Sequence, residues 1–229
     1  MKRSLVLLTF NEIEATPKVF DRIPLSSADE VFAVDGGSTD GTIPYLESKR
    51  LRVVVQEKRG RGEAFRIAAR EAKGQQLVFF SPDGNEDPAD IPRLFAALDA
   101  GADMAIASRM MKGAFNEEDV HWFRPRKWVN QSFTLAANLL WNRGPYITDT
   151  INGFRAVSKR AFDRLKPEAD GFVIEYQMSI RAMKLGLIVA EVPTREGQRA
   201  GGQSTAASLP TGIVFVRQFL KEIRIGKSF

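Results

Sequence analysis

Residues 30–42 read EVFAVDGGSTDGT, and this stretch decides the fold. Its first six residues are mostly apolar or β-branched and predict a strand that ends at Asp35, while the glycines that follow permit a tight turn. Ser38 or Asp40 can cap a helix that begins at Thr42. A strand, a glycine turn and a helix in this order are typical of a sheet with helical crossovers, in which Asp35 would lie at the ligand-binding edge. The glycine spacing matches neither the dinucleotide-binding motif nor the P-loop.

The same alternation continues on both sides of this stretch. Short apolar runs are separated by segments with helical periodicity, so the first half of the chain predicts an α/β fold, Rossmann-like, with a mainly parallel central sheet flanked by helices. Ligands bind such sheets beyond the carboxyl ends of the strands. The predicted strands are Ser4–Thr9, Glu30–Asp35, Arg52–Gln56, Gln76–Phe80 and Ala102–Ala107, and the predicted helices are Ile13–Arg22, Thr42–Lys49, Gly62–Lys73 and Asp90–Ala100.

The composition limits the classes of protein and of site. A length of 229 residues favours a single domain. The sequence has no cysteine and one histidine, His121, so any bound metal must rely on oxygen ligands. The formal charge of +5 favours anionic partners, but the basic residues are scattered among the predicted loops, which argues against a nucleic-acid binder. No apolar run has the length of a transmembrane helix and no signal peptide is apparent, which predicts a cytoplasmic protein.

The second half of the chain departs from the alternation after Ser108. A polar loop precedes a basic and aromatic stretch, residues 121–128, and a predicted helix that ends near Trp141. We expect this part to shape a binding site for an acceptor. The later segments predict a helix over 172–185, a strand over 187–192, a glycine-rich loop over 199–204 and a C-terminal helix over 211–227.

Polar, mostly glycine-containing segments follow the first four predicted strands. They are residues 9–12 (TFNE), 35–42 (DGGSTDGT), 58–62 (KRGRG) and 81–88 (SPDGNEDP). In order and spacing these motifs resemble family 2 glycosyltransferases, in particular the enzymes, dolichyl-phosphate mannose synthase among them, that pass a sugar onto a polyprenyl phosphate. The resemblance covers about residues 4–204 and implies the GT-A fold.

The resemblance implies a donor site for a nucleotide sugar. Asn11, Glu12 and Asp35 would surround the base and ribose. Arg59 and Arg61 would neutralise the diphosphate, for which guanidinium groups are well suited. The donor-binding residues implied in this way are Thr9, Asn11, Glu12, Asp35, Arg59, Arg61, Ser81 and Asp83.

The resemblance also implies a divalent cation, Mg²⁺ or Mn²⁺, held against the donor diphosphate. Asp83 matches the second aspartate of the family's D-x-D motif and is expected to be a metal ligand together with Asn85. Ser81 replaces the first aspartate of that motif. A serine hydroxyl is a neutral and weaker ligand, so we expect a lower metal affinity or compensation by a neighbour such as Asp87.

An acceptor site is implied for the second half of the chain. Arg109 follows the fifth predicted strand, and Arg126 or Lys127 falls at the family's second basic position. Arg199 and Ser204 match a basic loop that touches phosphates in the family. The implied catalytic residues are Asp83, Arg109 and Arg199, and the implied acceptor-binding residues are Arg109, Arg126, Lys127, Arg199 and Ser204. Residues 1–229 then form one glycosyltransferase domain with a nucleotide-sugar-binding part (about 1–108), an acceptor-binding part (about 109–210) and an amphipathic helix (about 211–227).

The expected reaction is an inverting transfer from the nucleotide sugar to a polyprenyl phosphate. A phosphate monoester is already largely anionic at neutral pH, so this acceptor needs no general base. Two alternatives remain open. A family 2 enzyme that acts on a hydroxyl group of a glycan would need a carboxylate base, for which Asp149 and Glu175 are the candidates. The second alternative follows from Ser81, which weakens the metal motif. In this case the chain would bind a nucleotide sugar without catalysing a transfer.

The basic and aromatic stretch and the C-terminal helix predict attachment to a membrane surface. From Ile213 onward apolar residues recur at helical spacing, with basic residues on the other faces. Trp122 and Trp128 are interleaved with cationic residues, a composition that is favourable at lipid headgroups. We therefore expect a peripheral protein of the cytoplasmic face, bound either to the membrane surface or to a membrane-embedded partner.

Overall fold

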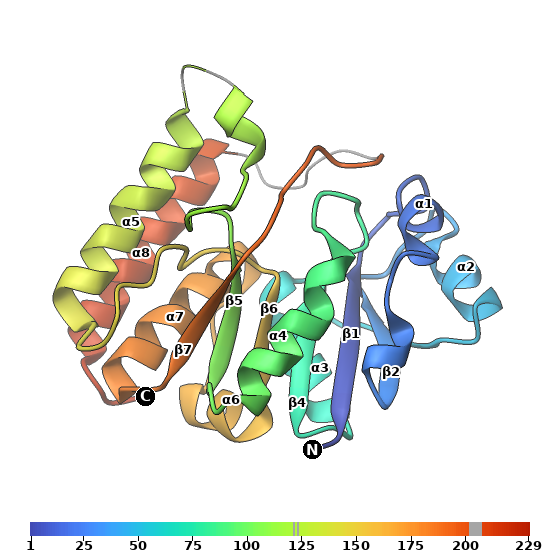
Figure 1. Cartoon of the computed structure of the whole chain (residues 1–229), viewed down its shortest axis with the longest axis horizontal. Coiled ribbons are helices and arrows are strands. Elements are labelled where there is room, and N and C mark those ends of the chain that lie inside the picture. Colours follow the sequence, from blue (N-terminus) through green and yellow to red (C-terminus); the bar gives the residue numbers. More distant parts are fainter. Residues whose placement is uncertain (121, 123, 202–207) are drawn as a thin grey trace.

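A seven-stranded sheet in the order β3-β2-β1-β4-β6-β5-β7 forms the centre of the computed structural model, which describes residues 1–120, 122, 124–201 and 208–229 (Figure 1). Neighbouring strands are parallel except where β6 lies antiparallel to both β4 and β5. The mainly parallel sheet is therefore confirmed. The strands are β1 (Arg3–Thr9), β2 (Glu30–Asp35), β3 (Arg52–Val55), β4 (Gln76–Phe80), β5 (Met104–Ser108), β6 (Arg155–Ser158) and β7 (Val189–Pro193).

Helices cover both faces of this sheet and divide the core in two. Alternate residues of β1 show this, because Val6 and Leu8 belong to one buried cluster whereas Leu5 and Leu7 belong to the other. Helices α1, α2 and α4 pack on the second cluster, and α3, α5, α6, α7 and α8 contribute to the first (Figure 1). The helices are α1 (Thr16–Phe20), α2 (Thr42–Ser48), α3 (Arg61–Glu71), α4 (Ile91–Asp99), α5 (Pro125–Trp141), α6 (Lys159–Leu165), α7 (Ile174–Leu185) and α8 (Ser208–Ile225).

Helices α5 and α8 lie side by side at one end of the molecule (Figure 1). Aromatic contacts join them, with ring centroids 5.4 Å apart for Phe133 and Phe215 and 5.3 Å apart for Trp141 and Phe219. The inner face of α8 therefore belongs to the core of the domain. No helix within the described ranges is long and apolar enough to cross a membrane.

A buried ionic cluster fixes α8 to α7. The carboxylate of Glu222 accepts hydrogen bonds from Arg181 Nε at 3.1 Å and from Lys184 Nζ at 2.6 Å. It also accepts hydrogen bonds from the side-chain amides of Gln177 and Gln218. Glu222 and Arg181 are fully buried. The cluster thus places a carboxylate of α8 against two cations of α7 inside the protein.

Candidate active site

The loops after β1 and β2 are joined through Asp35 at the carboxyl end of the sheet. One carboxylate oxygen of Asp35 accepts the hydroxyl hydrogens of Thr9 at 2.6 Å and Ser38 at 2.7 Å. The other oxygen accepts the backbone N–H groups of Gly37 at 2.8 Å and Ser38 at 2.6 Å. Asp35 is fully buried. Its carboxylate therefore fixes the shape of the turn, and its contact with a nucleotide stays a prediction.

Asn11 and Glu12 lie on the loop after β1, directly beside the loop after β2. Asn11 has a positive φ of 53°, its backbone N–H donates to Ser38 Oγ, and its side-chain oxygen accepts the backbone N–H of Thr39. The backbone N–H of Glu12 donates to Thr42 Oγ1 at 2.9 Å. The Glu12 carboxylate takes no part in these contacts.

Asp83, at the end of β4, forms an ion pair with Arg199 from a segment far along the chain. Nη1 of Arg199 lies 2.7 Å from Oδ2 of Asp83, and Nη2 lies 2.5 Å from Oε1 of Glu12. Asp83 is only 6% exposed. The structure therefore brings together three predicted site residues from three separate loops.

Carboxylates are in excess around Asp83. Burial raises the pKa of Asp83, although the positive charge of Arg199 acts in the opposite direction. Burial likewise raises the pKa of Glu12. Burial and the charge of Asp83 raise the pKa of Glu86 to about 8, and Glu86 accepts the backbone N–H of Ser81 at 3.0 Å. Such a site favours an added cation, because positive charge would stabilise the ionised carboxylates.

The donor groups near Asp83 suit a hard divalent cation. The Asn85 side-chain oxygen is buried and has no hydrogen-bond partner among the residues that the structure describes, so it is available as a ligand. Asp83 supplies a carboxylate on the same loop. The described part of the chain holds no group of three or more histidine, aspartate or glutamate side chains in metal-binding arrangement. Mg²⁺ or Mn²⁺ would therefore depend on Asp83, on Asn85 and on oxygens of the donor itself.

Arg61, the first residue of α3, points into the site and is held there by Glu175. Its guanidinium pairs with the Glu175 carboxylate, and Nη1 lies 3.4 Å from Ser81 Oγ. A Cβ atom on Gly153 would lie 1.8 Å from Nη2 of Arg61, so a side chain at residue 153 would displace the guanidinium from this position. Arg59 is exposed and stacks over the Phe10 ring at 4.5 Å.

A second cationic group lies beyond β5. Arg109 makes a two-pronged ion pair with Asp149, with Nε–Oδ2 at 2.7 Å and Nη2–Oδ1 at 3.1 Å, and its Nη1 lies 3.3 Å from Glu196. Burial would raise the pKa of Asp149, but the charge of Arg109 and the hydrogen bonds from Arg109 and the Ile151 backbone together outweigh burial, so its pKa is lowered. Arg109, Arg126 and Lys127 line one shallow hollow together with Asn116, Glu117, Glu118, Asn130 and Glu196.

The predicted residues therefore form two groups. Asp83, Glu12 and Arg199 lie together, whereas Arg109, Arg126 and Lys127 surround the second hollow. Ser204 and His121 lie outside the described residues. Sequence reasoning missed Glu86 and Glu196. Glu86 could have been noticed as an added carboxylate within the motif that lacks its first aspartate, whereas no local pattern marks Glu196.

Comparison with known proteins assigns the chain to a family. The sequence profile of glycosyl transferase family 2 matches residues 4–165 of the chain. The chain belongs to this family. The GT-A fold expected for a family 2 glycosyltransferase is confirmed by solved structures of glucosyl-3-phosphoglycerate synthase from Mycobacterium tuberculosis. The complex with UDP is 24% identical with a TM-score of 0.75, covering 99% of this chain and 82% of that one. A complex with Mn²⁺ and UDP-glucose has a TM-score of 0.72 at 22% identity, covering 98% of this chain and 79% of that one.

Curated relatives of this family 2 chain are similar along most of its length. The glycosyltransferase AglJ of Haloferax volcanii is 29% identical and the dolichol-phosphate mannosyltransferase of Pyrococcus furiosus is 30% identical. The matches cover 86% and 89% of this chain but only 63% and 59% of those relatives. The undecaprenyl-phosphate mannosyltransferase of Micrococcus luteus is 30% identical, with 89% of this chain and 87% of the relative covered.

Proposed function

We propose that this chain transfers a sugar, with inversion, from a nucleotide-sugar donor to a polyprenyl phosphate. Two of the relatives carry names that specify mannosyl transfer to dolichol phosphate or undecaprenyl phosphate. The solved structures with UDP-glucose and Mn²⁺ support a nucleotide sugar as donor and a divalent cation as cofactor. Another solved structure of the same enzyme contains phosphoglyceric acid together with Mn²⁺ and UDP-glucose, so the acceptor class needs an argument of its own.

The observation that carries the lipid-phosphate proposal is the state of the two candidate bases. Asp149 is buried and bound through both oxygens to Arg109, and its lowered pKa makes it a weak proton acceptor. Glu175 is 2% exposed and pairs with Arg61. A hydroxyl acceptor would need a carboxylate that can remove its proton. A phosphate monoester is already anionic, so an acceptor of this kind can be used without either carboxylate.

Each group of residues then has a part in the transfer. Asp83 and Asn85 would hold Mg²⁺ or Mn²⁺, which supplies positive charge to the departing diphosphate. Arg61, close to Ser81, provides a guanidinium for the same oxygens. The hollow lined by Arg109, Arg126 and Lys127 has a volume of only about 10 Å³, so an anionic acceptor would lie against this surface and not inside it. Arg126 is the most exposed of these cations and would meet the acceptor phosphate first.

Replacing Arg126 by alanine is expected to raise the KM for polyprenyl phosphate about tenfold, because one charge-assisted hydrogen bond to phosphate is lost. The affinity for the donor should change by less than about twofold, since Arg126 belongs to the second hollow. Initial rates with undecaprenyl phosphate and either UDP-glucose or GDP-mannose would measure the first effect. Isothermal titration with the donors would measure the second.

Two comparisons make this experiment decisive. Arg70→Ala removes an exposed arginine of α3 and should leave the KM unchanged. Transfer to phosphoglyceric acid but not to undecaprenyl phosphate would contradict the lipid-phosphate proposal. Donor binding without transfer to any acceptor would favour the non-catalytic alternative.

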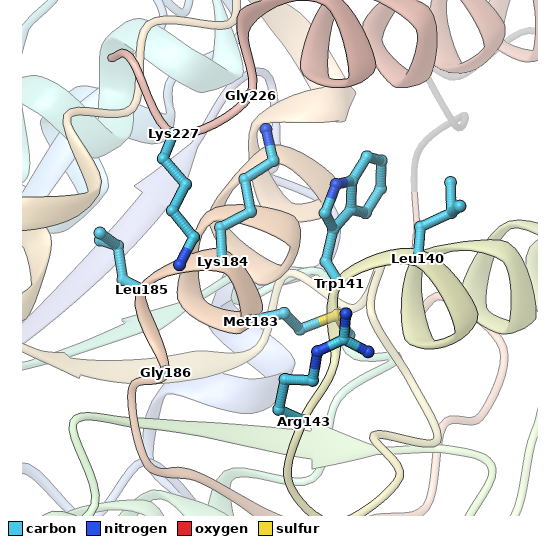
Figure 2. A pocket seen from close by; sticks show the side chains of 9 residues that line it. All are labelled: Leu140, Trp141, Arg143, Met183, Lys184, Leu185, Gly186, Gly226 and Lys227. Carbon is cyan, nitrogen blue, oxygen red and sulfur yellow. The ribbon is translucent and has the colours of Figure 1, made fainter.

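We also propose that the outer face of α5 and α8 binds a membrane surface. At the lower end of this face Arg143 and Lys227 line a hollow of about 330 Å³ beside Trp141 (Figure 2). Apolar rings and cations together suit a surface of anionic lipid headgroups. The large exposed apolar side chains of the two helices are Trp128, Val129, Leu135, Leu139, Leu140, Ile213, Val214, Val216, Leu220 and Ile223.

The double substitution Leu139→Glu with Leu220→Glu is expected to reduce binding to vesicles at least about tenfold, because two apolar contacts become charged. Sedimentation with phosphatidylglycerol vesicles at low and high salt would show this, and salt should weaken binding of the unchanged protein. Ile188→Glu, which is equally exposed but lies next to β7, serves as the control. If the unchanged protein fails to bind vesicles at low salt but still uses polyprenyl phosphate, a membrane-embedded partner is the better explanation.

A further inference from the structure

Arg199 lies between the carboxylates of Glu12 and Asp83, which the donor and its cation would need. Its guanidinium contacts Asp83 at 2.7 Å and Glu12 at 2.5 Å, and the two side-chain carboxylates are only 8% and 13% exposed. Its Nε is buried and has no hydrogen-bond partner within the described ranges. The guanidinium thus supplies positive charge to the same Asp83 oxygen that would otherwise be available to a divalent cation.

The backbone around Arg199 is fastened to the same loop. The N–H of Ala200 donates to the carbonyl of Asp83 at 2.9 Å, and the N–H of Gly197 donates to the carbonyl of Asn85 at 2.9 Å. Lys18 Nζ of α1 donates to the carbonyl of Ala200 at 2.7 Å. Gly84 has a φ of +89°, and a Cβ atom there would lie 2.4 Å from the Cβ of Ala200. The segment and the loop therefore fit against each other without space for a side chain at residue 84.

In this arrangement Arg199 and a divalent cation compete for the carboxylate of Asp83. The Oδ2 atom of Asp83 that accepts the charge-assisted bond from Arg199 is a poorer ligand than a free carboxylate oxygen, so the Arg199 contact opposes the binding of a cation at Asp83. A ligand that binds one of two states has its apparent affinity reduced by the fraction of protein in the other state. Removal of Arg199 from the carboxylates would also leave its guanidinium free to bind an anion.

We propose that Arg199 is an internal cation that pairs with Glu12 and Asp83 before the donor binds, is displaced when a divalent cation enters with the nucleotide, and is then free to bind the acceptor phosphate. This inference rests on the proposed function and adds the order in which the two substrates bind. Donor binding comes first, because only displacement from Glu12 and Asp83 gives Arg199 a free guanidinium. Arg199 is in this sense a positioning residue that links the two substrates.

The test compares the binding of Mn²⁺ with UDP, and separately with GDP, to the unchanged protein and to Arg199→Ala. The variant is expected to bind the preferred nucleotide about 5- to 10-fold more tightly, because its carboxylates no longer have an internal partner. Its turnover rate should nevertheless fall at least about tenfold. Arg199→Lys keeps the charge but not the two-pronged contact, so its affinity for the nucleotide should lie between those of the unchanged protein and Arg199→Ala. Lys18→Ala loosens the segment while keeping Arg199 and should tighten binding about twofold.

Thermal denaturation supplies a second readout. The ligand-free Arg199→Ala protein should melt at a lower temperature than the unchanged protein, yet show a larger increase when Mn²⁺ and nucleotide are added. A purely structural arginine would lower the melting temperature without enlarging that increase. Weaker or unchanged nucleotide binding by Arg199→Ala would overturn the proposal. If the unchanged protein binds neither nucleotide, the proposed function fails, and with it the exchange.

Discussion

Asp83→Asn is expected to lower the rate of sugar transfer about 100- to 1,000-fold. Ser81 replaces the first aspartate of the metal motif and Asp83 supplies the second, so the amide leaves neither of these two positions with a carboxylate. The amide has nearly the same shape, and the raised pKa of Asp83, which results from burial, shows that the folded protein gains little from that charge. Initial rates at saturating donor and acceptor with Mg²⁺ or Mn²⁺ would measure the loss.

The fold of this variant should persist. We expect its circular dichroism spectrum to be unchanged and its melting temperature to move by only a few degrees, since Glu12 still pairs with Arg199. Asp21→Asn replaces a carboxylate with a side chain that is 87% exposed and should retain full activity. Retention of full metal-dependent transfer by Asp83→Asn would show that the divalent cation does not depend on Asp83.

Glu222→Gln is expected to lower the free energy of unfolding by about 3–5 kcal/mol. Glu222 is the buried carboxylate to which Arg181 and Lys184 donate, and its loss leaves two buried cations without that counter-charge. The change affects the packing of α8 on α7, so the outer face that we propose for the membrane would be lost together with stability. Urea unfolding followed by circular dichroism would measure the difference.

Glu168→Gln is the matched comparison for this experiment. Glu168 also pairs with Arg181, at 2.8 Å, but its side chain is 53% exposed. Pairs in contact with water contribute little, so we expect a loss of less than about 1 kcal/mol. Equal losses in the two variants would mean that the buried position of Glu222 has no special effect. Because the inner face of α8 is buried, point substitutions test membrane binding more cleanly than removal of the helix.

Much of the sheet could be predicted from local pattern. Strands such as β1 and β4 are buried on both faces and therefore appear as continuous apolar runs bounded by turn residues. The antiparallel strand β6 is harder, because its neighbours β4 and β5 lie far from it in sequence. Helix α6 was not predicted. It has only seven residues, although Ser158 caps it by accepting the N–H of Ala161.

The candidate site was predictable in its residues but not in their pairing. Asp35 and Asp83 stand at strand ends, where a parallel sheet gathers polar groups, so their positions follow from the alternation of elements. The partner of Asp83 is Arg199, which lies 116 residues away in sequence. Neither periodicity nor spacing indicates a contact between segments so far apart. The same holds for Glu196 beside Arg109, which depends on where the chain returns after β7.

The position of β6 between β4 and β5 has a consequence for synthesis of the protein. A nascent chain that has emerged only as far as Ser108 contains β4 and β5 but not β6, the strand that lies between them in the sheet. One edge of β4 and both edges of β5, whose partners are β6 and β7, then have unpaired backbone groups. At about 5–20 residues per second, roughly 2–10 s pass before Ser158 follows. The donor loops on β1, β2 and β4 therefore emerge well before the strand that completes the sheet beside them.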